Sequence, residues 1–233
     1  MSDEETAIKK IIEAYNDVVK GIDAQAKTNS DRFYGGIIRA GKGKLVESIG
    51  KRLIVLAWQK LKQDETRLTM EGTHITIPIK QDYVDNLKDK NLKEYITANI
   101  TDYHYRYKPD ILVQIDETPV LEIECKAYTE NAMIKRILVD ATLIKTVYPN
   151  MRFALLQLES QLGGDYSELN KVTAGSKPTN TLLSYFDIDL TIITLLKGER
   201  NINRPIHRYF KPLEEESLNR AIDAIATILK PYI

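Results

Sequence analysis

The sequence predicts an α/β fold in which helices flank a mixed β-sheet. Amphipathic patterns of helical spacing open and close the chain, and short apolar runs of strand length fill its middle. A further helical pattern lies between two of those runs, so the order is helix, hairpin, helix, strand, strand, helix. The chain has 233 residues, of which 43% are hydrophobic and 28% charged. That is enough chain for one covered core, and we expect a single domain over 1–233.

The first part of the chain predicts two helices and a strand. Apolar residues recur every three or four positions over 4–27, and again over 44–63. The intervening stretch 28–43 carries four glycines and is typical of a loop. A short alternating strand is expected at 75–79, followed by a charged and helical stretch at 81–100.

The middle and end of the chain supply the remaining elements of the expected sheet. Strands over 110–116 and 120–128 are separated by a short turn, and a helix is expected to follow. Polar residues dominate 160–181, which we interpret as a loop region. The remaining expected elements are a helix at 130–147, strands at 153–158 and 188–196, and a helix at 213–229.

Charge and composition exclude several classes of protein. Lys plus Arg equals Asp plus Glu at 33 each, so any polyanion must be bound by a local basic face or through metal ions. Cys125 is the single cysteine, which excludes an internal disulfide framework. The longest apolar run spans six residues, 53–58, and the acidic N-terminus does not resemble a signal peptide. We therefore expect a soluble, cytoplasmic protein with no membrane contact.

The predicted hairpin brings acidic and basic side chains together. If its turn is centred on Glu117, residues whose numbers sum to 234 face each other, and Asp110 lies opposite Glu124. Side chains alternate along a strand, so Glu122, Glu124 and Lys126 share one face and Cys125 lies on the other. A turn one residue shorter or longer would place Asp110 diagonally or on the opposite face.

Such a cluster suits a magnesium site. Two close carboxylates repel each other unless a cation compensates, and Mg²⁺ is typically held by one or two carboxylates together with water and substrate phosphate. An ion there lowers the pKa of a bound water and neutralises charge on a phosphodiester. A lysine two residues after the second carboxylate stands beside that water, where it can orient it or help to deprotonate it.

These residues resemble a known nuclease motif. Pro109-Asp110, thirteen further residues and then Glu124-Cys125-Lys126 are similar to the PD-(D/E)xK signature of the restriction-endonuclease-like nucleases, and of the type II restriction endonucleases in particular. The resemblance implies a restriction-endonuclease-like core over about 44–158. It implies that Asp110 and Glu124 ligate Mg²⁺, with Mn²⁺ as a substitute, and that the Cys125 carbonyl completes the site.

The same resemblance implies the remaining roles and the reaction. Lys126 is then the catalytic lysine, and Glu47 on the upstream helix is a candidate third acidic residue. The implied activity is hydrolysis of phosphodiester bonds in double-stranded DNA at a specific short sequence, leaving 5′-phosphates. A two-fold DNA target favours a homodimer, and restriction enzymes imply a prokaryotic cytoplasm.

Other interpretations of the same residues stay open. A short motif occurs by chance in charged chains, and the plainer alternative is a solvated hairpin face with a minor Glu124–Lys126 contact. Glu122 shares the predicted face and is an alternative ligand, although solvent or a cross-strand charge is its simpler partner. The rival functions are a repair or recombination nuclease of the same fold that recognises DNA structure, and a non-catalytic DNA-binding or interaction module.

Several basic residues are candidates for contact with DNA. They lie on the glycine-rich stretch before the second helix, before the first strand of the hairpin, and in the region 160–211, which we interpret as recognition loops. The aromatic and basic tract 103–108 is expected to lead into the first core strand. The candidate DNA-binding residues are Arg39, Lys42, Lys44, Arg106, Lys177, Arg204 and Arg208.

Overall fold

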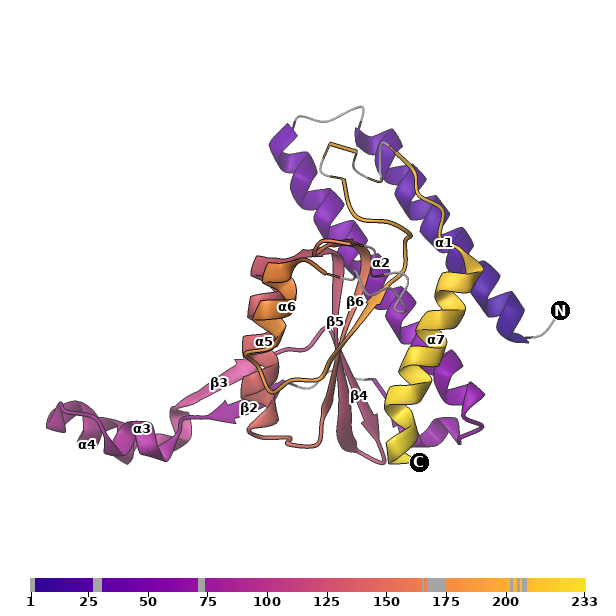
Figure 1. Cartoon of the computed structure of the whole chain (residues 1–233). Helices are drawn as coiled ribbons and strands as arrows, with labels where there is room; N and C mark the ends of the chain where they lie inside the picture. The colour runs from indigo at the N-terminus through magenta and orange to yellow at the C-terminus, as the bar shows by residue number, and fades with distance from the viewer. Residues whose placement is uncertain are drawn as a thin grey trace.

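The computed structural model describes residues 3–26, 31–70, 74–164, 166, 175–201, 203–204, 206 and 209–233, with the side chains of 22–26 and 31–40 left out. The elements follow the chain as shown in Figure 1. The helices are α1 (Asp3–Ala26), α2 (Asp31–Lys60), α3 (Gln81–Asp85), α4 (Lys90–Ala98), α5 (Asn131–Lys145), α6 (Lys177–Leu183) and α7 (Glu215–Leu229). The strands are β1 (Leu68–Thr69), β2 (Ile75–Pro78), β3 (His104–Tyr107), β4 (Ile111–Ile115), β5 (Thr118–Glu130), β6 (Arg152–Gln161) and β7 (Leu190–Thr194).

A five-stranded sheet in the order β1-β4-β5-β6-β7 forms the centre of the molecule. β4 is antiparallel to β1 and to β5, whereas β6 is parallel to both β5 and β7. Helix α5 makes the crossover between the parallel strands β5 and β6, which a hairpin cannot connect. The prediction of a mixed sheet flanked by helices is therefore confirmed.

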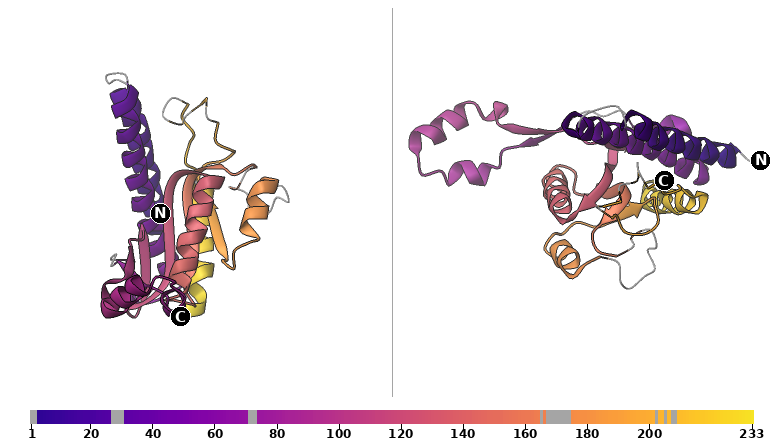
Figure 2. Two further views of the ribbon diagram at one scale, coloured as in Figure 1. Left: turned by 90° about the vertical axis from the view of Figure 1, so that its left-hand side faces the viewer. Right: turned by 90° about the horizontal axis from the view of Figure 1, so that it is seen from above.

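Helices cover the two faces of this sheet (Figures 1 and 2). On one face α1, α2 and α7 share the main hydrophobic core with β4, β5 and β6. On the other face α5 and α6 pack on β6 and β7. Among the described helices, none is long and apolar enough to cross a lipid bilayer.

Gly50 allows α2 to lie directly on the sheet. A Cβ atom added at this position would stand 2.8 Å from Ile111 Cδ1 and 3.0 Å from Leu156 Cδ2, closer than side chains normally approach. The helix therefore contacts β4 and β6 at the level where the predicted catalytic hairpin begins. This close approach also fixes the height of Glu47, which lies one turn earlier on α2.

Helix α2 corrects the prediction of a loop over 28–43. The structure describes this helix from Asp31, and only 27–30 lie outside the described residues. Each glycine lowers helix propensity by about 1 kcal/mol relative to alanine but does not end a helix, and no proline lies between 31 and 60. The loop prediction gave the glycines too much weight.

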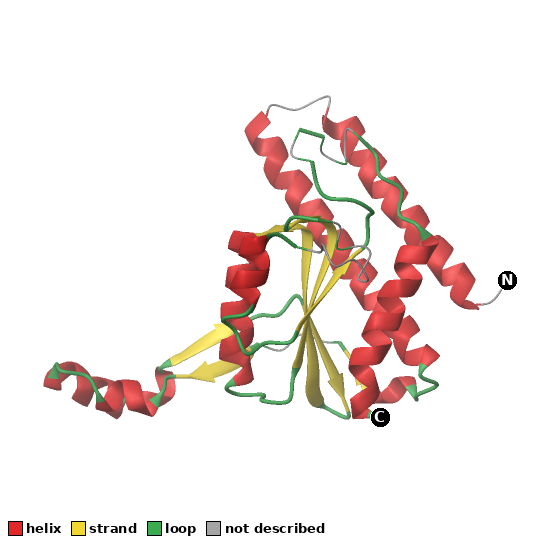
Figure 3. Cartoon of the chain, in the orientation of Figure 1, coloured by secondary structure: helices red, strands yellow, loops and turns green. Residues whose placement is uncertain are grey.

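A separate arm leaves the body between α2 and the hairpin (Figures 1 and 3). Its two strands, β2 and β3, pair antiparallel in a sheet of their own, and α3 and α4 lie between them in the chain. The prediction that the tract 103–108 leads the first core strand is therefore wrong. Pro109 separates β3 from β4 because it fixes the backbone and has no N–H for a ladder.

Helix α6 corrects the prediction that 160–181 is loop throughout. Ser176 caps the helix by accepting a hydrogen bond from the Thr179 N–H, and Pro178 lies in its first turn. Serine at the N-cap followed by proline in the first turn is a known start signal, so the sequence carried this information. The part of this region at 167–174 lies outside the described residues.

Candidate active site

The hairpin β4–β5 has the register that the sequence predicts. Ile111 pairs with Ile123 and Val113 with Leu121, so the position numbers sum to 234. The turn consists of Asp116 and Glu117, both with positive φ, as in the two-residue turns that match the twist of a hairpin. Next to this turn, Ile115 pairs with Thr118 and the position numbers sum to 233. A register shift between Val113 and Gln114 restores the sum of 234 that a turn centred on Glu117 predicts.

Asp110, Glu124 and Lys126 meet at the start of β4. The Lys126 ammonium lies 3.4 Å from Asp110 Oδ2 and donates a hydrogen bond to Glu124 Oε1. Asp110 Oδ2 also accepts a hydrogen bond of 2.9 Å from the Cys125 backbone N–H. The Asp110 side chain therefore accepts the hydrogen bond from β5 that a backbone carbonyl would accept if β4 began earlier. The lysine bridges the Asp110 and Glu124 carboxylates.

Burial and charge act against each other in this cluster. Burial raises the pKa of Glu124, and the attraction of Lys126 offsets only part of that shift. Burial lowers the pKa of Lys126, but the Glu124 and Asp110 carboxylates outweigh burial and raise it overall. The lysine is therefore held as a cation in this arrangement.

A cleft of 340 Å³ opens beside these residues, between α2 and α5. Asp110, Lys126 and the neighbouring backbone form its floor, and Glu47 from α2 lies in its wall. Glu47 forms an ion pair of 2.7 Å with Lys51 on the same helix. The residues that line the cleft are Gly43, Glu47, Asp110, Cys125, Lys126, Ala127, Tyr128 and Met133.

Glu122 lies outside this cleft and is buried, with 2% of its surface exposed. The Tyr107 hydroxyl donates to Glu122 Oε1 at 3.0 Å and lies 3.3 Å from Glu124 Oε2. Burial first, and then the charge of Glu124, raise the pKa of Glu122 well above its usual value. The interpretation of this hairpin face as solvated is therefore wrong, because the base of the arm covers it.

Tyr107 is the site residue that sequence reasoning did not identify. It belonged to the tract 103–108, whose alternation of aromatic and basic residues suggested a surface that binds DNA. Burial, together with Glu122 and Glu124, raises its pKa, so the hydroxyl keeps its proton. Its position two residues before Pro109-Asp110 was the only available signal.

The donor chemistry of the cleft suits a hard divalent cation. Two carboxylates already share one cation, the Lys126 ammonium, and oxygen ligands of this kind are those that Mg²⁺ prefers. The N–H and C=O of a strand residue point to the same edge, so the Cys125 carbonyl faces the Asp110 side with its N–H. Within the described ranges, however, no three His, Cys, Asp or Glu side chains are gathered closely enough to hold a metal ion.

The predicted DNA-binding residues lie in different environments. Lys44, Arg106, Lys177 and Arg204 are exposed. Lys42 is buried, and burial lowers its pKa to about 8, so its ammonium does not lie on the surface. The Arg39 side chain and Arg208 lie outside the described residues.

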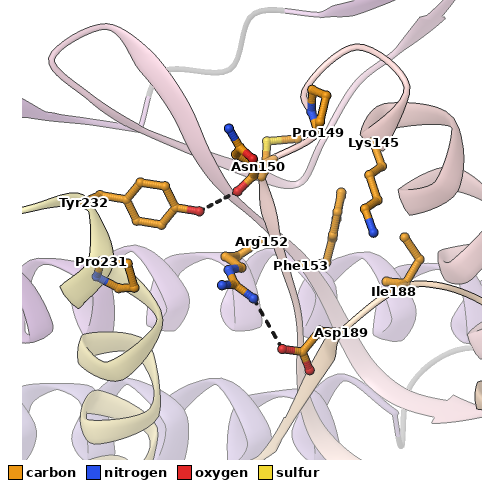
Figure 4. Close-up of a pocket in the computed structure, with 10 residues that line it drawn as sticks. Lys145, Pro149, Asn150, Arg152, Phe153, Ile188, Asp189, Pro231 and Tyr232 are labelled. Atoms are coloured by element: carbon orange, nitrogen blue, oxygen red, sulfur yellow. Dashed lines mark hydrogen bonds and ion pairs between the residues drawn. The ribbon is translucent and has the colours of Figure 1, made fainter.

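A second hollow, of 310 Å³, lies at the start of β6, near the C-terminal end of the chain (Figure 4). Its basic side chains already have acidic partners: Lys145 is 2.9 Å from Asp187, and Arg152 is 3.4 Å from Asp189. Tyr232 donates a hydrogen bond to the Asn150 carbonyl. Because its basic groups are already paired, this hollow is more typical of a junction between secondary-structure elements than of a site for an anionic substrate.

Comparison with known proteins gives one extended likeness. The chain is 49% identical over 222 residues to the type II restriction enzyme DdeI of Desulfomicrobium norvegicum, covering 92% of each chain. The solved structure of the native BbvCI A2B2 tetramer has 12% identity and a TM-score of 0.37 over 98% of this chain and 90% of that one, which is too weak a likeness to support an argument. No protein-family model matches the chain.

Proposed function

The chain belongs to the type II restriction enzymes, and we propose that it is a Mg²⁺-dependent endonuclease that cuts a short specific sequence in double-stranded DNA and leaves 5′-phosphates. We place this activity in a prokaryotic cytoplasm. The observation that carries the proposal is the meeting of Asp110, Glu124 and Lys126 at one edge of the hairpin, beside an open cleft.

We assign the metal to Asp110, Glu124 and the Cys125 carbonyl, with Glu47 as a further acidic group in the cleft wall. The bound Mg²⁺ supplies Lewis acidity that stabilises negative charge developing on the phosphodiester. The Cys125 N–H holds the Asp110 carboxylate in place, which fixes one ligand before the cation binds.

Lys126 is assigned to the attacking water. Its ammonium is a hydrogen-bond donor that can orient this water for in-line attack on phosphorus, opposite the 3′-oxygen that leaves. The water loses a proton as it attacks, the bond between phosphorus and the 3′-oxygen breaks, and that oxygen takes up a proton from solvent, so one product carries a 5′-phosphate and the other a 3′-hydroxyl. Lys126 is hydrogen-bonded to Glu124 and lies 3.4 Å from Asp110, where it can orient this water or help to deprotonate it.

DNA contacts are assigned to basic residues around the cleft and in 160–211. Lys44, Arg106, Lys177 and Arg204 are exposed, as contact with phosphate requires. Arg39 and Arg208 belong to the same proposal, whereas the buried Lys42 could contact phosphate only if its side chain became exposed on binding. Phosphate contacts of this kind fix the position of the protein on the duplex, and base contacts from the loops select the sequence.

Metal dependence can be tested with plasmid DNA. In Mg²⁺ the protein is expected to give discrete fragments, and EDTA is expected to abolish cleavage. Ca²⁺ is expected to support DNA binding without efficient cutting, since it takes oxygen ligands in a looser geometry. The fragment ends, read by sequencing, give the recognition site. Smears or cutting limited to junctions would point to a repair nuclease instead, and rapid cleavage in Ca²⁺ alone would contradict the metal assignment.

We also propose that the active form is a homodimer. Two strands must be cut, and a target with two-fold symmetry is matched by a protein with the same symmetry. Analytical ultracentrifugation of the protein with a duplex that carries the mapped site is expected to show two chains for each duplex. One chain bound to each duplex under conditions that allow cleavage of both strands would contradict this assembly.

A further inference from the structure

The base of the arm reaches into the candidate active site through Tyr107. This residue ends β3, where it pairs with Ile75 of β2. Its ring packs in a small hydrophobic core with Ile75, Leu112 and Phe153, so the ring position is fixed by the sheet and by the arm together. Its hydroxyl is then directed at two carboxylates of β5.

We propose that Tyr107 is a positioning residue that holds Glu124 in the orientation needed to bind the catalytic cation, an inference that rests on the proposed function. The hydroxyl lies 3.3 Å from Glu124 Oε2, while Oε1 of the same carboxylate points to Lys126. Contacts on both oxygens fix the plane of the carboxylate, and they leave Oε1 on the side of Asp110.

Electrostatics explains why Glu124 needs this second contact. Asp110 shares the Lys126 ammonium with Glu124, and the buried Glu122 lies at the same tyrosine hydroxyl, so two further acidic groups surround this carboxylate. A glutamate side chain has three rotatable bonds, so without a contact on Oε2 it could turn toward solvent and away from the site. Lys126 alone could not prevent this once a metal ion competes for the same oxygen.

Glu122 holds the hydroxyl from the other side. Its Oε1 lies 3.0 Å from the Tyr107 oxygen, and the residue is buried. Glu122 and Glu124 therefore share the single proton of the Tyr107 hydroxyl, so that one donor serves a buried carboxylate and the predicted metal ligand. The arm strand β3 is therefore connected to the predicted ligand by a hydrogen bond as well as through the backbone.

The test is to change Tyr107 to phenylalanine and measure the affinity for a metal ion directly. Mn²⁺ is titrated by calorimetry into the full chain bound to a duplex that carries the mapped site with a non-hydrolysable linkage at the cut position, so that the metal binds without cleaving the DNA. Tyr107→Phe is expected to weaken Mn²⁺ binding by about ten- to a hundredfold, the factor that corresponds to loss of a hydrogen bond to a charged group. DNA affinity should not change, and cleavage should approach the wild-type rate at saturating Mg²⁺.

Tyr105→Phe is the matched control, because Tyr105 lies two residues earlier on the same strand and is exposed. It removes the same atom, and its Mn²⁺ affinity should equal that of the wild type. An unchanged Mn²⁺ affinity in Tyr107→Phe, with the wild type cutting normally, would overturn the inference and leave the proposed function intact. A wild type that neither binds Mn²⁺ nor cuts would overturn both.

A second pair of variants covers the case in which Tyr107→Phe does not fold. Loss of the hydroxyl leaves buried Glu122 without its donor, and Glu122→Gln removes that acidic group while keeping its shape. The double variant Tyr107→Phe/Glu122→Gln is then compared with Glu122→Gln alone. The same weakening of Mn²⁺ binding is expected between these two, and equal affinities would refute the role of the hydroxyl.

Discussion

Replacement of Lys126 with alanine is expected to lower the rate of DNA cleavage by about 10²–10⁴-fold, the range typical of a lost proton-transfer or donor group. The side chain is only partly buried and its partners are charged, so the loss falls on the reaction step more than on folding. DNA binding in Ca²⁺ should stay close to that of the wild type. Single-turnover cleavage and a filter-binding assay measure the two effects separately.

Lys60→Ala is the control for the loss of a lysine. Lys60 ends α2 and pairs with Asp223 on α7, an exposed contact worth less than about 1 kcal/mol. The Lys60→Ala enzyme should cut at the wild-type rate.

Asp110→Ala should resemble Lys126→Ala, because it removes a proposed ligand of the metal. A Lys126→Ala enzyme that cuts at the wild-type rate would exclude the mechanism.

Replacement of Glu122 with glutamine is expected to stabilise the protein by about 1–3 kcal/mol at pH 8, the usual cost of burying a polar group that is poorly compensated. Burial raises the pKa of Glu122 in the folded state above its ordinary value of 4.5. The folded state therefore favours the protonated acid. The contribution of Glu122 to the free energy of unfolding is therefore most favourable below pH 4.5, and it falls as the pH rises from there toward the pKa of Glu122 in the folded state.

The gain from Glu122→Gln should therefore grow as the pH rises. Urea denaturation in EDTA at pH 5 and pH 8 measures it, with Glu117→Gln as control. Glu117 is an exposed carboxylate in the β4–β5 turn, and its amide should show no such trend. A Glu122→Gln protein that is less stable than the wild type at pH 8 would mean that the buried carboxylate is charged and well compensated.

The catalytic hairpin could be predicted because its geometry is local. The two-residue turn alone would place Asp110 opposite Ile123, but the register shift between Val113 and Gln114 restores the predicted pairing beside Asp110. The mixed sheet and its flanking helices followed from periodicity in the same way. The resemblance to type II restriction endonucleases, which depended on these few residues, is confirmed by the likeness to DdeI.

The parts that were not predicted depend on contacts between distant segments. The glycines before Lys44 suggested a loop, whereas α2 extends through them. A later glycine of the same helix, Gly50, lies against the sheet. The burial of Glu122 depends on the base of the arm, where Tyr107, 15 residues earlier in sequence, donates a hydrogen bond to it. No periodicity in β5 reveals a tyrosine from another strand above its acidic face.

The buried thiol of Cys125 has a practical consequence for experiments in solution. Burial raises its pKa well above the usual value, so the reactive thiolate is scarce at neutral pH. A fluorescent maleimide will therefore prefer a cysteine introduced at an exposed position, such as Tyr83 or Tyr95 at the tip of the arm. The native cysteine, whose backbone touches Asp110, can stay in place while energy transfer between a dye on the arm and a second one at an exposed position of the body, such as Tyr185, tests whether the arm moves when the enzyme meets DNA.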